Sequence, residues 1–135
     1  MLFSQPSKYA LRALLHLAQK GPEPHLSREI ARALDVPEPF LAKILQNLVR
    51  HKLLQSFKGR GGGFKLAKPA KRISLLAVVQ AVEGPDFGHN CLLGLPECSE
   101  TNPCPLHDHW STHKARLFDM LENQTLAQAL RHEKK

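Results

Sequence analysis

The sequence lacks several features that would assign it to common classes of protein. No run of about eighteen apolar residues is present, so no transmembrane helix and no membrane partner are expected. The start of the chain has no basic flank followed by an apolar signal core, which predicts a cytoplasmic protein. No Walker lysine–hydroxyl pair and no G-x-G-x-x-G before a helix occur, which excludes a phosphate-cradling nucleotide loop. The length of 135 residues predicts one domain, or one compact module with an appendage.

Acidic residues are absent from the middle of the chain, between Glu38 and Glu83. The whole chain has a formal net charge of +7 and a pI near 9.6. Evenly spread charge would serve only solubility, but charge concentrated in one interval indicates a binding face for a polyanion, nucleic acid before membrane. The basic residues of this interval are Lys43, Arg50, Lys52, Lys58, Arg60, Lys65, Lys68, Lys71 and Arg72.

Two short helices joined by a tight turn are predicted after a first helix that begins at residue 8, with Ser7 as its N-cap. Ser27 is predicted to cap the second helix, and Pro39 suits the first turn of the third, which runs to about His51. The buried stripe of the third helix includes Phe40, and its outer face is small, polar and basic. This pattern favours a helix-turn-helix, with an ordinary helical hairpin as the alternative on this segment alone.

A β-hairpin is predicted directly after the third helix, with strands over residues 53–57 and 64–67 joined by a glycine-rich turn. The alternation of apolar and polar residues is interpreted as pointing Leu54 and Phe57 of the first strand toward the core. The turn carries Arg60 between glycines, and an arginine on so thin a tip can enter a minor groove. A hairpin in this position is the wing of a winged helix, which supports the helix-turn-helix interpretation.

Two further helices are predicted, over residues 73–82 and from His107 to about Glu122. The last helix is too apolar to cover itself, so it must pack on another element. Packing on the N-terminal helix of its own chain is one possibility. Packing against a second chain is favoured, because dimers read palindromic operators that a monomer reads poorly. The residues expected in this homodimer contact are Leu14, Trp110, Leu117, Met120 and Leu121.

All three cysteines, Cys91, Cys98 and Cys104, lie between these two helices in a glycine- and proline-rich stretch that is expected to be a loop. The spacing C-x6-C-x5-C lacks the C-x2–4-C element of a structural zinc site, and an odd number excludes a closed set of disulfides. Soft thiolates at loose spacing suit an iron–sulfur cluster, which needs a fourth ligand. The candidates are His107, nearest by spacing, and also Asp108, His109, His89 or a residue of a partner chain.

Two alternatives to a cluster stay open at the level of spacing alone. The cysteines could be unligated thiols, either buried or acting as redox switches. A cysteine–histidine nucleophile pair would make the protein an enzyme, which is not expected because no oxyanion or substrate-binding motif accompanies these residues.

Taken together, these segments resemble the iron–sulfur cluster regulators of the IscR/NsrR type, a family of bacterial winged-helix transcription factors. The marks are K-Y-A-L-R-A-L-L at Lys8–Leu15, the helix-turn-helix at Ile30–Leu45, R-G-G-G at Arg60–Gly63, A-V-V-Q-A-V-E-G at Ala77–Gly84 and the three-cysteine loop. The resemblance covers nearly the whole chain, and its specificity lies in the order of the marks. It implies a mainly α fold: a winged helix-turn-helix with a small β-hairpin, a cysteine-bearing loop and a long C-terminal dimerisation helix.

The resemblance also implies the ligands of the metal centre. The family's cysteine ligands fall on Cys91, Cys98 and Cys104, and His107 occupies the place of a histidine that completes a [2Fe–2S] cluster in IscR-like members. NsrR-like members hold a [4Fe–4S] cluster with an acidic ligand from the first helix, where this chain has Ser7-Lys8-Tyr9 and no carboxylate. The [2Fe–2S] form is therefore favoured over the [4Fe–4S] form.

The implied function is a sequence-specific repressor or activator whose DNA affinity depends on cluster status, redox state or nitric oxide. The alternative is a cluster-free regulator that senses through thiols or a protein partner. The expected parts are a DNA-binding domain over 1–84, a cluster loop over 85–106, and a dimerisation helix with a basic tail over 107–135. The residues expected at double-stranded DNA are Ser27, Glu38, Pro39, Ala42, Lys43, Gln46, Asn47, Arg50, Lys58, Arg60, Gly61 and Lys65.

Overall fold

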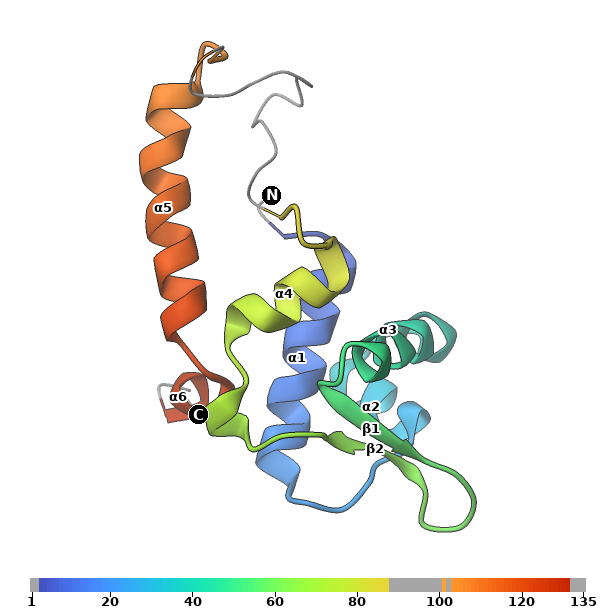
Figure 1. Ribbon diagram of the computed structural model, residues 1–135. Helices are drawn as coiled ribbons and strands as arrows, with labels where there is room; N and C mark the ends of the chain where they lie inside the picture. Colours follow the sequence, from blue (N-terminus) through green and yellow to red (C-terminus); the bar gives the residue numbers. More distant parts are fainter. Residues whose placement is uncertain (1–2, 88–100, 102, 132–135) are drawn as a thin grey trace.

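The computed structural model describes residues 3–87, 101 and 103–131, and shows a winged helix with a two-stranded hairpin and C-terminal helices. Figure 1 shows helix α1 near the centre, with the hairpin on one side and helix α5 on the other. The fold confirms the predicted mainly α architecture. Its elements are α1 (Gln5–Lys20), α2 (Ser27–Leu34), α3 (Glu38–Arg50), β1 (Leu54–Phe57), β2 (Gly63–Leu66), a 3-10 turn (Ala70–Arg72), α4 (Leu75–Glu83), α5 (His107–Asn123) and α6 (Leu126–Arg131).

Helix α1 carries the centre of the hydrophobic core. Ala10, Ala13 and Leu14 are completely buried, and α3 packs Leu41 and Leu45 into the same core. The predicted dimerisation role of Leu14 is therefore wrong, because its side chain is enclosed by its own chain. The same correction applies to Leu121 of α5, which is 1% exposed. An apolar stripe on a helix does not by itself distinguish the core of one chain from a contact with a second chain.

The hairpin is antiparallel, and its register pairs Leu54 with Leu66 and Ser56 with Phe64. Leu54 and Phe64 are buried, as expected, but Phe57 is 44% exposed. The inward orientation predicted for Phe57 is wrong because side chains alternate along a strand, so Phe57 faces away from Leu54. The Lys65 ammonium lies 5.3 Å from the centre of the Phe57 ring on this outer face.

The segment before α2 pairs with β2 of the hairpin through one isolated antiparallel bridge, between His25 and Phe64. His25 N–H donates to Phe64 O at 2.9 Å, and Phe64 N–H donates to His25 O at 2.7 Å. Gly63 has φ +135°, and a Cβ at this position would overlap the His25 backbone. Glycine is therefore required at the base of the hairpin, where two backbones meet without room for a side chain.

Helix α5 contacts α4 and the segment that follows α4. Phe118 of α5 stacks on Phe87 with ring centroids 5.5 Å apart, and Leu75 N–H donates to Gln124 O at 2.9 Å, where α5 ends. Most other side chains of α5 are half-buried or exposed, including Met120 at 46%. Within residues 3–87 and 103–131, every helix is too short or too polar to cross a membrane.

The N-terminus of α1 is fixed to the C-terminus of α4 by a cluster of hydrogen bonds that we call the Glu83 clasp. Ser4 donates to Glu83 Oε2 through its N–H at 3.2 Å and its hydroxyl at 2.5 Å, and the Ser7 hydroxyl donates at 2.6 Å. Ser4, not Ser7, caps α1, since Ser4 Oγ accepts from Ser7 N–H at 3.2 Å. Ser7 was wrongly predicted as the cap; it is fully buried and serves the clasp.

The clasp changes the pKa of Glu83. Burial raises the pKa, but the hydrogen bonds from the Ser4 and Ser7 hydroxyls and from the Ser4 N–H outweigh burial and leave the pKa of Glu83 below its ordinary value of 4.5. A lowered carboxyl pKa stabilises the fold above the pKa of the unfolded chain, and this contribution is lost as the pH falls through the folded pKa.

Glu83→Gln is expected to lower the free energy of unfolding by about 1 kcal/mol at pH 7, a modest value because the carboxylate is exposed. The difference from the unmodified protein should shrink as the pH falls below 4.5 and through the lowered pKa of Glu83, because Glu83 becomes protonated there. Urea unfolding across this range measures both effects. Glu122→Gln, at an exposed position of α5, is the control and should change little at any pH. A Glu83→Gln effect that does not vary with pH would argue against the clasp.

Candidate nucleic-acid interface

The outer face of α3 has the exposure that a recognition helix needs. Five of the residues predicted to lie at DNA on this helix are exposed to solvent: Glu38, Pro39, Lys43, Gln46 and Arg50. Ala42 is half-buried between them. Glu38 and Pro39 lie in the first turn, so the helix enters the surface with Pro39 where its missing N–H leaves no hydrogen bond unmade.

Asn47 differs from the orientation expected for it. Its side chain is half-buried, and Nδ2 donates to Ala81 O of α4 at 2.9 Å. Its Oδ1 accepts from Arg50 Nη2 at 3.2 Å. Asn47 therefore connects α3 to α4, and the prediction that its side chain faces outward is corrected.

Ser27 and Glu38 join the starts of α2 and α3. Ser27 lies inside α2 as its first residue, and its hydroxyl donates to Glu38 Oε2 at 2.8 Å. It does not cap the helix as predicted; Leu26 is the cap residue, and its N–H donates to Glu29 Oε1 at 2.8 Å. The hydrogen bond between Ser27 and Glu38 joins α2 to α3 at the edge of the candidate surface.

Phe40 was predicted to be buried but is 40% exposed. Its ring meets Tyr9 of α1 edge-on, with centroids 5.6 Å apart at 85°. Arg12 lies 5.9 Å from the centre of the Tyr9 ring, and its Nη2 donates to Leu34 O at 2.8 Å. The contact between Tyr9 and Phe40 therefore joins α1 to α3 at a partly exposed position.

The tip of the hairpin exposes the predicted minor-groove residue. Gly59 and Gly61 have φ of +80° and +75°, which glycine adopts at little cost, and Gly62 N–H donates to Gly59 O at 2.9 Å to close the turn. Lys58, Arg60 and Gly61 are exposed, and Lys65 is half-buried. The tip therefore exposes the basic residues Lys58 and Arg60 on a tight turn, and Lys65 follows in β2.

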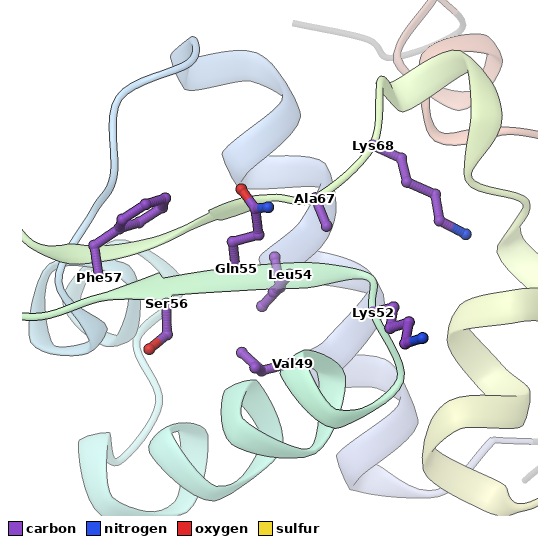
Figure 2. A pocket seen from close by; sticks show the side chains of 8 residues that line it. All are labelled: Val49, Lys52, Leu54, Gln55, Ser56, Phe57, Ala67 and Lys68. Carbon is purple, nitrogen blue, oxygen red and sulfur yellow. The ribbon is translucent and has the colours of Figure 1, made fainter.

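A groove of about 570 Å³ lies between α3 and β1 (Figure 2). Its walls combine apolar side chains such as Val49 and Leu54 with the polar Gln55 and Ser56. Figure 2 shows Lys52 and Lys68 extending toward the same side of the groove, at the end away from the hairpin tip. Neither lysine was singled out from the sequence, although both belong to the acid-free interval that signalled a basic face.

The predicted metal ligands are only partly within the described residues. Cys91 and Cys98 lie outside them. Cys104 is half-buried and lies three residues before His107, which is the first residue of α5. His107 N–H donates to Cys104 O at 3.0 Å, so the two residues belong to one turn of backbone. In the part of the chain that the structure describes, no three His, Cys, Asp or Glu residues form a group that could hold a metal ion.

Comparisons with known proteins agree with this geometry. The profile of the Rrf2 family, described as iron-dependent transcriptional regulators, matches residues 3–132. A relative from Aquifex aeolicus (strain VF5), named only provisionally as an HTH-type transcriptional regulator, is 34% identical and aligns over 100% of this chain and 95% of its own. The HTH-type transcriptional regulator IscR of Sodalis glossinidius is 29% identical, over 98% of this chain and 81% of its own.

A solved structure shares the fold. That of CymR, the global cysteine regulator of B. subtilis, superimposes with a TM-score of 0.81 at 21% identity and covers 99% of both chains. The match to this family over residues 3–132, together with the winged helix, identifies the chain as a DNA-binding transcriptional regulator. The chain belongs to the Rrf2 family of transcriptional regulators.

Lys58→Gln is expected to weaken DNA binding by a similar factor on all duplexes and to lower the slope of log affinity against log salt by about one, because one phosphate contact is lost. The measurement is fluorescence anisotropy over a range of salt on a selected and a random duplex. Arg116→Gln on α5, which Figure 1 places on the far side of α1 from the hairpin, is the control. An unchanged slope in Lys58→Gln would remove Lys58 from the interface.

Proposed function

We propose that this chain is a bacterial transcriptional regulator whose affinity for a palindromic operator is controlled by an iron–sulfur cluster held by Cys91, Cys98, Cys104 and His107. The match of the whole described chain to a family of iron-dependent regulators carries the proposal. The donor set fits, because three thiolates and one imidazole are soft ligands of the kind that bind iron–sulfur clusters. The turn that joins Cys104 to His107 supports a common centre, and this donor set favours [2Fe–2S] over [4Fe–4S].

The DNA-binding part of the proposal assigns roles to exposed residues. Lys43, Gln46 and Arg50 of α3 face the major groove or its phosphates, and Arg60 at the hairpin tip enters the minor groove. The further residues proposed at this interface are Ser27, Glu38, Pro39, Ala42, Lys58, Gly61 and Lys65. Asn47 is left out of direct contact because its amide is occupied within the chain.

A homodimer is proposed through α5. Leu106 and Met120 are 38% and 46% exposed, and Trp110 and Leu117 are half-buried on the same side of the helix. Exposed large apolar side chains in one stripe favour a second copy of this helix as the cover. Two copies related by a twofold axis would present two α3 helices to a palindromic operator.

The cysteine loop connects α4 to α5, so it joins the DNA-binding part to the dimerisation helix. A bound cluster would supply redox chemistry and a target for nitric oxide. The chain's own residues hold the two ends of the loop: the Glu83 clasp fixes the end of α4, and a backbone hydrogen bond joins Cys104 to His107, the first residue of α5. A change at the ligands would thus alter how two α3 helices are spaced on an operator.

A cluster-free regulator is the second candidate. The likeness to CymR, which is named as a global cysteine regulator, favours it. In this version the three cysteines act as thiols, or the loop binds a protein partner, and operator affinity responds without iron.

Anaerobic purification with iron and sulfide analysis and a visible spectrum tests the proposal. A [2Fe–2S] protein should hold about two iron and two sulfide per chain and absorb visible light. Cys98→Ala should abolish the absorption, and His107→Ala should shift it. His109→Ala, two residues further along α5, is the matched control and should leave the absorption unchanged. A colourless, iron-free protein that binds its operator would support the thiol regulator instead.

Met120→Glu is expected to shift the chain from dimer to monomer, since a carboxylate would be buried in the proposed contact. Sedimentation velocity over a concentration series measures the change. Ala115→Glu places the same charge on an exposed position on another side of α5 and should leave the dimer intact. Equal sedimentation of all three proteins would contradict a dimer through this face.

A further inference from the structure

The last turn of α4 has a carbonyl that its own helix does not satisfy. The final four carbonyls of an α-helix lack intrahelical partners. In α4 the Gln80 carbonyl accepts from Gly84 N–H at 2.9 Å, and the Ala81 carbonyl accepts from Asn47 Nδ2 at 2.9 Å. A side chain of α3 therefore caps the end of α4. The hydrogen bond joins two residues that lie 34 positions apart in the sequence.

The other end of the same amide holds Arg50. Asn47 Oδ1 accepts from Arg50 Nη2 at 3.2 Å, and Arg50 is exposed on the outer face of α3. A carbonyl can only accept and a guanidinium can only donate, so these two partners fix the orientation of the amide. Nitrogen faces α4 and oxygen faces Arg50. No other orientation of this side chain satisfies both.

The amide is planar, so its two contacts cannot move independently. If the last turn of α4 shifts, the Asn47 amide must rotate or lose the Ala81 carbonyl, and in either case its oxygen moves relative to Arg50. The opposite side of that turn is held by the Glu83 clasp to α1. The turn is therefore fixed at two points, and one of them leads directly to the candidate DNA surface.

We propose that Asn47 is a positioning residue for DNA reading: it sets the direction of the Arg50 guanidinium according to the position of the last turn of α4. The proposal rests on the proposed function, because it takes Arg50 as a DNA contact. It adds a route by which a displacement at the end of α4 reaches the operator. A purely structural Asn47 would hold α3 against α4 without affecting what Arg50 recognises.

A double-mutant cycle distinguishes the two roles. The probe is a duplex enriched by the unmodified protein from a randomised double-stranded library, and the measurement is its dissociation constant at fixed salt. Asn47→Ala should weaken binding roughly tenfold when Arg50 is present, comparable to loss of a base contact. In an Arg50→Ala background it should change binding less than about twofold, because nothing is left to position. Lys43→Ala, which lies two turns from Arg50, should be additive with Arg50→Ala.

Asn47→Asp separates the two contacts. Its carboxylate still accepts from Arg50 but repels the Ala81 carbonyl, so discrimination at the base read by Arg50 should persist while the connection to α4 is lost. Ser7→Ala, which weakens the clasp without charge change, should shift operator affinity severalfold when Asn47 is present. The same substitution should have little effect in the Asn47→Asp background.

The outcomes distinguish the DNA contact of Arg50 from the positioning role of Asn47. If Arg50→Ala leaves operator affinity unchanged, the proposed DNA role of Arg50 fails. If Arg50→Ala weakens binding and Asn47→Ala is equally harmful in both backgrounds, the positioning role fails while the DNA role stands. Thermal unfolding of each variant accompanies the binding data, and a loss of affinity that follows only the fall in melting temperature also overturns the positioning role.

Discussion

The packing of the other elements against α1 is the constraint on which the rest of the structure depends. Ala10 and Ala13 are completely buried, and such small side chains let neighbouring helices approach closely. Leu45 of α3 and Val78 of α4 reach the same core. The recognition helix and the helix that leads into the cysteine loop are therefore positioned by a shared neighbour, and the Asn47 amide joins them directly. The proposed DNA-binding surface is thus held by the core of the fold and is joined directly to the helix that precedes the cysteine loop.

The distribution of charge follows the same division. The acid-free interval supplies α3 beyond Glu38, the hairpin and the groove between them, so no carboxylate of these segments repels phosphate. The carboxylate at the end of the interval, Glu83, faces the N-terminus of α1, where a negative charge is stabilised by the helix dipole. The carboxylate at its start, Glu38, lies at the edge of α3 and accepts from Ser27. Acidic groups are thus kept at the borders of the basic face.

The order of elements could be predicted from the sequence because periodicity and glycine or proline breaks are local signals. Contacts between distant segments could not. Ser4 and Ser7 both suit an N-cap, and only the clasp shows which one is buried. The apolar Leu14 gave no sign of whether its own chain or a second one covers it. Asn47 was predicted to face outward because its partner, the Ala81 carbonyl of α4, lies far from it in the sequence. The cysteine ligands stay predictions, since most of their loop lies outside the described residues.

The pairing of His25 with β2 fixes the base of the hairpin, so we expect that its tip can be replaced by other sequences. Two backbone hydrogen bonds hold Phe64 to His25, and the missing side chain at Gly63 keeps that base closed. In contrast, a Cβ added at Gly59 or Gly61 would meet no atom within 4 Å, so these two positions of the tip have open space beside them. Grafted tips of other lengths or charges can therefore be inserted between fixed ends without moving α3. If Arg60 contacts the minor groove as proposed, such chimeras would change operator preference there and leave the proposed contacts of α3 unaltered.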